Sequence, residues 1–271
     1  MSAFFQGKVV IVTGSSNGIG EEIARQFAEK GAKVTITGRR IEGIKKTREL
    51  CIASGAKNGD LVEVVGDVTD DETLRRIVDE TVKAFGKIDV LVNNAGARLP
   101  ETPDFADQSI DALDESIAIN TKSAIRLSQL AAPHLSKTRG SIVNISSCAA
   151  KPFVRKEITR DVSDRIVLRH SPLALDQATV LLAGTYSKQG IRVNSVNPGL
   201  IRSDFQRRVG SDEDTLQKTY DIFKNTLAGR IGEPDDIAKI VLFIADRSQS
   251  EFIVGQCISA DGGVGLENKY M

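Results

Sequence analysis

Residues 8–26 read KVVIVTGSSNGIGEEIARQ. A run of β-branched residues ends in three glycines, Gly14, Gly18 and Gly20, and helix-forming residues follow. This order predicts a strand, a tight turn and a helix. Glycine permits positive φ angles and leaves no Cβ between the backbone and a bound phosphate, while the helix directs its unpaired N–H groups at the same point. The segment is therefore typical of a dinucleotide pyrophosphate site, although a plain tight turn would show the same glycines.

The composition limits the classes of partner. The chain has 271 residues, and 36 Lys and Arg balance 36 Asp and Glu. A neutral balance argues against a protein that coats nucleic acid or an anionic membrane, so we expect a small-molecule ligand or a protein partner. The length suits one large α/β domain spanning residues 1–271.

The cysteines and the N-terminus exclude further classes. Cys51, Cys148 and Cys257 lie far apart without CxxC spacing, so we interpret them as reduced thiols and expect neither a metal site nor a disulfide. The opening MSAFFQGK is too short and polar for a signal peptide, and no apolar run approaches ~18 residues. We therefore expect a cytoplasmic protein without a membrane partner.

Short β-branched or apolar runs alternate with helical patterns along the chain. The first strand lies in the opening segment, and the others are expected near residues 32–37, 61–65, 88–92, 141–145, 191–196 and 256–259. Helices are expected at residues 41–53, from 69 or 70 to 85, at 107–134, and from Pro234 onward. This order predicts an α/β fold: a single-domain, Rossmann-like, doubly wound parallel sheet of about seven strands with helices on both faces.

Two predicted strand ends carry residues suited to an adenosine. The second strand runs into Gly38, Arg39 and Arg40, where an acid would accept the ribose hydroxyls of NAD. A basic residue complements a 2′-phosphate instead, so the sequence favours NADP(H) over NAD(H). The alternative is that the two arginines only begin the next helix on a solvated face. Asp67 follows the third strand, where its carboxylate could accept from an adenine amino group.

Several motifs together resemble the short-chain dehydrogenase/reductase family over nearly the whole chain. They are TGSSNGIG at residues 13–20, NNAG at 93–96, Asn120, NISS at 144–147, RVNSVNPG at 192–199 and a closing DGG. The resemblance implies cofactor contacts from Thr13, Gly14, Ser16, Asn17, Gly18, Ile19 and Gly20 for the pyrophosphate, Arg39 for the 2′-phosphate, Asp67 and Val68 for the adenine, Asn93, Ala95 and Gly96 for the adenosine side, and Pro198 and Gly199 for the nicotinamide. A glycine-loop methyltransferase is the outside alternative, and the basic Gly38-Arg39 strand end counts against it.

By the same resemblance, catalysis would use a Ser, a Tyr, a Lys four residues later and a helix Asn. Ser147 and Asn120 match this pattern. Counting back from the tail at residues 174–177 places Leu168 at the tyrosine position and Pro172 at the lysine position. Ser171 and Pro172 are typical of a helix N-cap and first helical position, so we expect the next helix to begin there. His170 is the alternative acid, because a histidine titrates in a suitable range.

The resemblance implies an NAD(P)(H)-dependent oxidoreductase acting on a carbonyl compound or a secondary alcohol. The alternative hypothesis is a catalytically impaired NADP(H)-binding or regulatory protein, motivated by Leu168 and Pro172. A third hypothesis is that residues 151–172 come from an altered exon or a misread gene model, because a charged stretch interrupts an intact pattern. The resemblance also implies a substrate lid at residues 203–229 and a homodimer or homotetramer.

Overall fold

The computed structural model describes residues 4–97, 109–150, 164–203, 217, 220 and 226–266, and for residues 164–170 it describes the backbone alone. Most of the segment expected to form a lid, 203–229, therefore lies outside the described residues. So do residues 151–163, the first part of the charged stretch that interrupts the family pattern.

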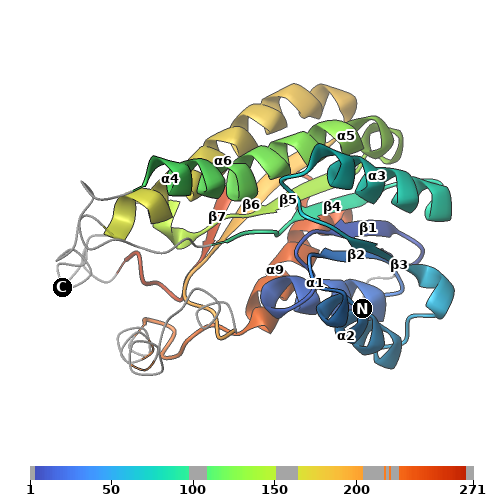
Figure 1. The fold of residues 1–271 in the computed structure, drawn as a ribbon, viewed down its shortest axis with the longest axis horizontal. Coiled ribbons are helices and arrows are strands. Elements are labelled where there is room, and N and C mark those ends of the chain that lie inside the picture. The colour runs from blue at the N-terminus through green and yellow to red at the C-terminus, as the bar shows by residue number, and fades with distance from the viewer. Residues whose placement is uncertain are drawn as a thin grey trace.

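The described chain forms one parallel sheet of seven strands in the order β3-β2-β1-β4-β5-β6-β7 (Figure 1). Its strands are β1 (Val9–Val12), β2 (Lys33–Gly38), β3 (Leu61–Val65), β4 (Val90–Asn93), β5 (Ser141–Ile145), β6 (Arg192–Pro198) and β7 (Cys257–Ala260). The predicted fold class is confirmed. The direction of winding reverses between β1 and β4, which places the glycine loop after β1 at the point where such sheets bind ligands.

Helices cover both faces of this sheet (Figure 1). Their bounds are α1 (Gly18–Glu29), α2 (Ile41–Ala53), α3 (Asp71–Phe85), α4 (Ile110–Ile117), α5 (Ser123–Thr138), α6 (Asp164–Tyr186), α9 (Pro234–Ala245) and α10 (Arg247–Ser250). In β1, Val10 and Val12 join the core beneath α1 and α9, whereas Ile11 joins the core beneath α3 and α5. Alternate side chains of a strand point to opposite faces, so one buried strand contributes to both cores.

Local signals fix several helix ends as predicted. The Asp70 carboxylate caps α3 by accepting from the backbone N–H groups of Glu72 and Thr73, both at 3.2 Å. Gly86 ends the same helix with φ of 78°. Pro234 occupies the first turn of α9, where a missing N–H has no intrahelical role.

Two predicted helices differ from the structure. The long helix expected at residues 107–134 consists of α4 and α5, joined through a π-helical turn at Ala118–Lys122 that contains Asn120. The prediction that the next helix begins at Ser171 is wrong, because α6 begins at Asp164 and Pro172 lies inside it. Tertiary hydrogen bonds hold the backbone around this proline: Thr121 Oγ1 donates to the Ser171 carbonyl at 3.0 Å, and Ser146 Oγ donates to the Pro172 carbonyl at 3.2 Å.

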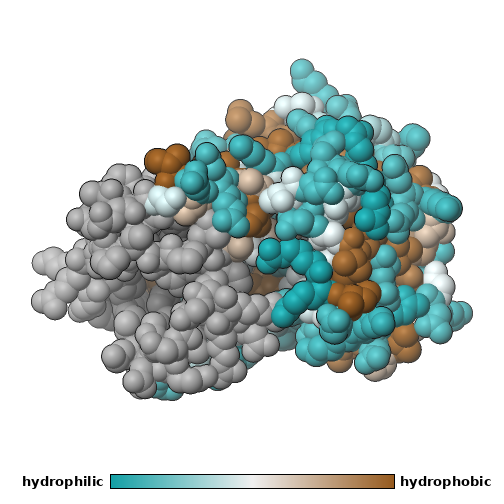
Figure 2. Space-filling model, viewed as in Figure 1, coloured by the Kyte–Doolittle hydropathy of each residue, from teal (hydrophilic) through white to brown (hydrophobic). Residues whose placement is uncertain are grey.

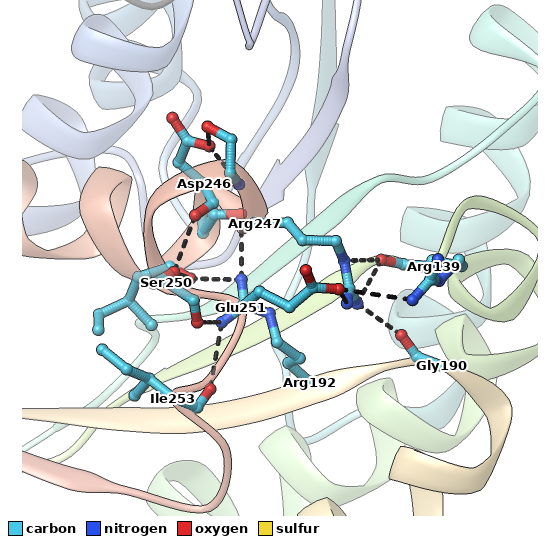
Figure 3. A network of polar contacts seen from close by, with 11 residues as sticks. Arg139, Gly190, Arg192, Asp246, Arg247, Ser250, Glu251 and Ile253 are labelled. Carbon is cyan, nitrogen blue, oxygen red and sulfur yellow. Dashed lines mark hydrogen bonds and ion pairs between the residues drawn. The ribbon is translucent and has the colours of Figure 1, made fainter.

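Two arginines attach the segment after α9 to the amino-terminal edge of the sheet (Figure 3). The buried Arg192 side chain donates from Nη1 to the carbonyls of Ser250 at 3.0 Å and Ile253 at 3.2 Å, and from Nη2 to the carbonyl of Ile244 at 2.7 Å. Arg247 donates from Nη2 to the Gly190 carbonyl at 2.6 Å. This edge is opposite the one that carries the predicted ligand site.

Hydrophilic residues cover much of the described part of the face in Figure 2, with hydrophobic residues interspersed. Among the described residues, no helix combines the length and the apolar character needed to cross a bilayer.

Candidate cofactor and active site

The glycine loop after β1 is held against the loop after β4. Gly14 has φ of 61°, and a Cβ built there would lie 2.8 Å from Ala95 Cα, so both the conformation and the contact require glycine. Asn94 Nδ2 donates to the carbonyls of Thr13 at 2.9 Å and Gly14 at 3.1 Å. Thr13 Oγ1 in turn accepts from the backbone N–H groups of Asn94 and Ala95. Asn94 therefore holds the glycine loop against the loop after β4.

The amino end of α1 faces this loop and lies close to the segment after β6. Gly18 opens the helix with φ of 57°, and a Cβ there would lie 3.4 Å from Ser203 Cβ. Asn17 precedes the helix, and in the described structure its amide bonds to Ser16 Oγ at 3.3 Å instead of capping the first turn. Backbone N–H groups at such a helix end attract anions. The glycine cradle therefore fits a dinucleotide pyrophosphate.

The end of β2 leaves no room for an acid where NAD-binding folds carry one. A Cβ at Gly38 would lie 2.9 Å from both Cβ and Oγ of Ser16, so any side chain there requires Ser16 to shift. Arg39 follows it and is 69% exposed, with Nη1 3.7 Å from Asp67 Oδ2. The other Asp67 oxygen accepts from Thr69 N at 2.9 Å and Thr69 Oγ1 at 2.8 Å, while Val68 is half-buried. Only one Asp67 oxygen therefore faces Arg39.

The Asn93 side chain lies inside the core. It donates to Asn144 Oδ1 at 2.8 Å and to Ser128 Oγ at 3.2 Å. Asn144 Nδ2 continues the chain of hydrogen bonds to Thr179 Oγ1 on α6 at 2.8 Å. The Asn93 side chain therefore links β4 to α5 and β5 inside the core, and a cofactor contact at this residue stays a prediction.

The segment after β5 fixes the conformation of Ser147. A 3₁₀ turn at Cys148–Ala150 follows it, and Ser147 Oγ accepts from the Ala149 N–H at 3.1 Å. The Ser147 carbonyl accepts from Ala150 N at 3.0 Å and from Asn197 Nδ2 at 3.1 Å. A hydroxyl oxygen that accepts one bond keeps its hydrogen for donation to another oxygen, such as that of a substrate.

The nicotinamide end of the predicted site follows β6. A Cβ at Gly199 would lie 2.8 Å from Asp261 Cα, and the Gly199 N–H donates to the Ala260 carbonyl at 3.1 Å. Pro198 ends β6 beside β7. The close approach of backbone to backbone explains the glycine and places the PG turn at the same edge of the sheet as the glycine loop and Ser147.

The Asn120 side chain holds the loop after β4 in place through two hydrogen bonds to Ala97. Its Oδ1 accepts from Ala97 N at 2.8 Å, and its Nδ2 donates to the Ala97 carbonyl at 2.9 Å and to Ser171 Oγ at 3.0 Å. The side-chain amide thereby joins the π-helical turn to both the NNAG segment and α6. Among the described residues, the contacts of the Asn120 side chain are hydrogen bonds that connect these segments to one another.

Positions 168 and 172 lie one turn apart on α6, with the Pro172 carbonyl beside Ser146 Oγ. Tyr186 is the last residue of this helix and is 8% exposed in the core, where burial raises the pKa of its phenol. It lies fourteen residues along α6 from Pro172, about 20 Å at ~1.5 Å per residue, and is therefore far from the end of the helix that contacts Ser146. The side chain of His170, the alternative acid, lies outside the described residues.

Two residues at this edge, Asp176 and Asn197, have no predicted role, whereas Asn94 lies within the NNAG segment that is predicted to contact the adenosine side of the cofactor. Asn94 and Asn197 stand inside the quoted NNAG and RVNSVNPG motifs, so motif membership was the available signal. Asp176 stands in the ALDQ tail, where nothing local distinguishes it from a solvated helix residue.

Comparison with known proteins extends these observations. The sequence profile of the family described as enoyl-(acyl carrier protein) reductase matches residues 14–265. An uncharacterized oxidoreductase of Thermotoga maritima is 36% identical over 96% of this chain and 98% of its own length. A 7alpha-hydroxysteroid dehydrogenase of Paraclostridium sordellii is 35% identical over 96% of this chain and 93% of its own. A solved short-chain dehydrogenase/reductase of unknown function from Caenorhabditis elegans, with cofactor, aligns with a TM-score of 0.90 at 41% identity, covering 97% of each chain.

Proposed function

The chain belongs to the short-chain dehydrogenase/reductase family, and from that premise we propose that it transfers hydride between NADP(H) and a small carbonyl compound or secondary alcohol. The principal support is a meeting of three segments at one edge of the sheet. The glycine cradle, the PG turn at Gly199 and the turn after Ser147 lie at the carboxyl ends of β1, β6 and β5 of the same parallel sheet. This edge is where doubly wound sheets bind a dinucleotide.

The nicotinamide, when bound, supplies or accepts the hydride. The chain's own residues orient the reactants: the first turn of α1 holds the pyrophosphate, and the Ser147 hydroxyl donates its hydrogen to the substrate oxygen. Asn120 and Asn94 keep the loops around these groups in place. The positions that carry a Tyr and a Lys in the family pattern are Leu168 and Pro172. The proton that completes the alcohol, or that leaves it in the reverse direction, would therefore be exchanged with water, and we expect this transfer to be slower by about 10²- to 10⁴-fold than with a general acid present.

Arg39 and Gly38 support NADP(H) over NAD(H). The exposed Arg39 guanidinium can bind a 2′-phosphate, and the close contact between position 38 and Ser16 disfavours an acid for the ribose. Relatives named L-fucose dehydrogenase and 7alpha-hydroxysteroid dehydrogenase support a secondary alcohol as substrate class. We further propose a cytoplasmic, homo-oligomeric protein in which residues 203–229 cover the substrate.

The test is an NADPH titration followed by its own fluorescence, then turnover on ketones, aldehydes and secondary alcohols. Saturable NADPH binding with turnover on at least one substrate class supports the proposal. Binding without any turnover would instead favour the impaired, regulatory alternative, to which the comparisons lend no support because the relatives are named dehydrogenases.

A further inference from the structure

A buried carboxylate lies behind Ser147. Asp176 is on α6, four residues beyond Pro172, and is 6% exposed. Its Oδ1 accepts from Ser195 Oγ at 3.0 Å, and its Oδ2 accepts from Asn197 Nδ2 at 2.7 Å. Among the described residues no Lys or Arg forms an ion pair with it. Burying a carboxylate with only neutral partners is unfavourable, so the position calls for an explanation.

The carboxylate fixes the orientation of the Asn197 amide. Asn197 is fully buried in β6, and its Nδ2 lies between two oxygens that can only accept: Asp176 Oδ2 and the Ser147 carbonyl at 3.1 Å. Its Oδ1 lies 2.9 Å from Ser195 Oγ, whose single hydrogen can be donated either to this oxygen or to Asp176 Oδ1. This arrangement admits one orientation of the amide, with nitrogen toward Ser147.

Asn197 in turn connects two strand ends of the proposed site. It holds the Ser147 carbonyl from β6, while the Ala149 N–H holds the Ser147 hydroxyl oxygen from the following turn. With its carbonyl and its hydroxyl both fixed, Ser147 can present the hydroxyl hydrogen in one direction. Displacing a positioned group by about 1 Å can lower a rate by about 10²-fold.

We propose that Asn197, locked by the buried carboxylate of Asp176, is a positioning residue for Ser147. The inference rests on the proposed function only in naming Ser147 as the group that binds the substrate oxygen. The structural part of the inference is independent of that function: the hydrogen bond from Asn197 Nδ2 to the Ser147 carbonyl determines how firmly the Ser147 turn is held.

The test compares Asp176→Asn with the exchanged pair Asp176→Asn/Asn197→Asp in the full chain. In the single variant, the amide oxygen introduced at position 176 can still accept from Asn197, and Asn197 still donates to Ser147. In the exchanged pair, an amide–carboxylate hydrogen bond remains between the two positions, but the carboxylate introduced at position 197 has no N–H for the Ser147 carbonyl. The exchanged pair keeps one buried carboxylate, as in the unmodified chain, whereas Asp176→Asn has none. Both variants are therefore also compared with the unmodified chain, from which the exchanged pair differs chiefly at the contact with Ser147.

The first readout is backbone hydrogen exchange of residues 147–150, which does not depend on turnover. We expect these amides to exchange at least about tenfold faster in the exchanged pair than in Asp176→Asn, because the turn loses one of its anchors. Thr179→Val is the matched control: it removes the buried bond from Asn144 to the same helix α6 and should lower the melting temperature without selectively accelerating residues 147–150. Equal exchange in the two Asp176 proteins would overturn the inference.

The second readout is steady-state kinetics. The exchanged pair should lose about tenfold or more in kcat relative to Asp176→Asn at the same NADPH affinity, because the cradle is untouched and only Ser147 moves. A purely structural role predicts equal kcat for the two variants at a temperature where both are folded, and that result would also overturn the inference. If the unmodified chain shows no turnover, the proposed function fails, while the exchange experiment still decides the role of Asn197.

Discussion

At the scale of single residues, the adenosine end of the site offers a direct test of cofactor choice. Arg39 and Arg40 are adjacent, but only Arg39 lies within ion-pair distance of Asp67. Arg39→Gln should weaken NADPH binding by about 10- to 100-fold and leave NADH binding nearly unchanged, because a charged hydrogen bond to the 2′-phosphate contributes roughly 1.5–3 kcal/mol. The measurement is the ratio of the two dissociation constants.

Arg40→Gln is the matched control, since Arg40 only precedes α2 and is exposed. Similar effects of both substitutions would show that the arginines act as a general positive surface. An unchanged ratio in Arg39→Gln would remove the support for NADP(H).

Cys148 stands next to Ser147 but should be an inert thiol. Removal from water, with the Asp261 carboxylate adding to it, raises the pKa of the Cys148 thiol to about 12. At pH 8 only about one thiol in 10⁴ would then be ionised, and the thiolate is the reactive form. Labelling with a thiol reagent at pH 8, followed by mass spectrometry of the peptides, should therefore be far slower at Cys148 in the folded protein than in the urea-unfolded chain. Equal rates in the two states would show that the thiol of the half-buried Cys148 is not shielded from water in the folded protein.

At the scale of secondary-structure elements, α6 carries the two positions at which the family pattern has its proton-transferring Tyr and Lys. Positions 168 and 172 are already one turn apart on this helix, and the backbone of position 172 contacts Ser146. Leu168→Tyr/Pro172→Lys should therefore raise kcat by about 10²-fold or more, as expected when a general acid is added at a prepared site. The measurement is turnover of a carbonyl substrate with NADPH.

Pro172→Ala is the control for this experiment. It removes a proline from a helix interior and should raise the melting temperature, but it adds no proton donor. A double variant that is no faster than Pro172→Ala would show that α6 does not direct these positions at the Ser147 turn.

The strands and most helices were predictable because their signals are local. Residues 61–65, 141–145 and 41–53 form the predicted elements, since buried β-branched runs and helix-start residues act over a few positions. The start of α6 was not predictable. The Ser171-Pro172 pair is typical of a helix start, but hydrogen bonds from Thr121 and Ser146, which are distant in sequence, carry the helix through the proline.

Some parts of the candidate site could likewise be predicted from local sequence, and others could not. The glycine loop could be located from its own residues, whereas the inward direction of Asn93 and the pairing of Asp176 with Asn197 depend on how α5 and α6 pack against the sheet. A sequence read without that packing cannot distinguish a ligand-facing amide from a buried one.

The start of α9 carries a pH-dependent contribution to stability. Arg230 donates to both oxygens of Asp236, at 2.6 and 2.7 Å, and chiefly for this reason the pKa of that carboxyl falls from its ordinary value of 3.8 to about 2. A depressed folded-state pKa stabilises the fold above the ordinary value, and this contribution is lost as pH falls from about 4 toward 2.

Asp236→Asn should therefore lower the free energy of unfolding by up to about 1 kcal/mol between pH 5 and 8, because the pair is partly exposed. The difference from the unmodified chain should shrink as pH falls toward 2. Urea unfolding at a series of pH values measures both. A difference that stays constant down to pH 2 would show that the charge of Asp236 is not its source.

At the scale of the whole molecule, ligand binding and mechanical attachment occupy opposite edges of the sheet. The carboxyl edge carries the glycine cradle, Ser147 and the Asp176–Asn197 pair. The amino edge carries the Arg192 and Arg247 network of Figure 3, which attaches the segment from α9 to β7. Stability and cofactor binding should therefore respond to different substitutions.

Arg192→Met tests this separation. Burial lowers the pKa of the Arg192 guanidinium to about 10, so it remains charged at neutral pH and keeps its bonds to the carbonyls of Ile244, Ser250 and Ile253. Methionine fills part of the same volume but donates nothing. The carbonyls of Ile244, Ser250 and Ile253 each keep one other donor, so the cost is the loss of the hydrogen bonds from the charged guanidinium, about 1.5–3 kcal/mol each. We expect a loss of about 3 kcal/mol or more in the free energy of unfolding, measured in urea. Arg126→Met, at its exposed pair with Asp71, should cause a much smaller loss. At temperatures where the variant is folded, its NADPH dissociation constant should be unchanged, because no bond of Arg192 reaches the carboxyl edge. A weaker NADPH affinity in the folded variant would mean that the two edges are coupled through β6.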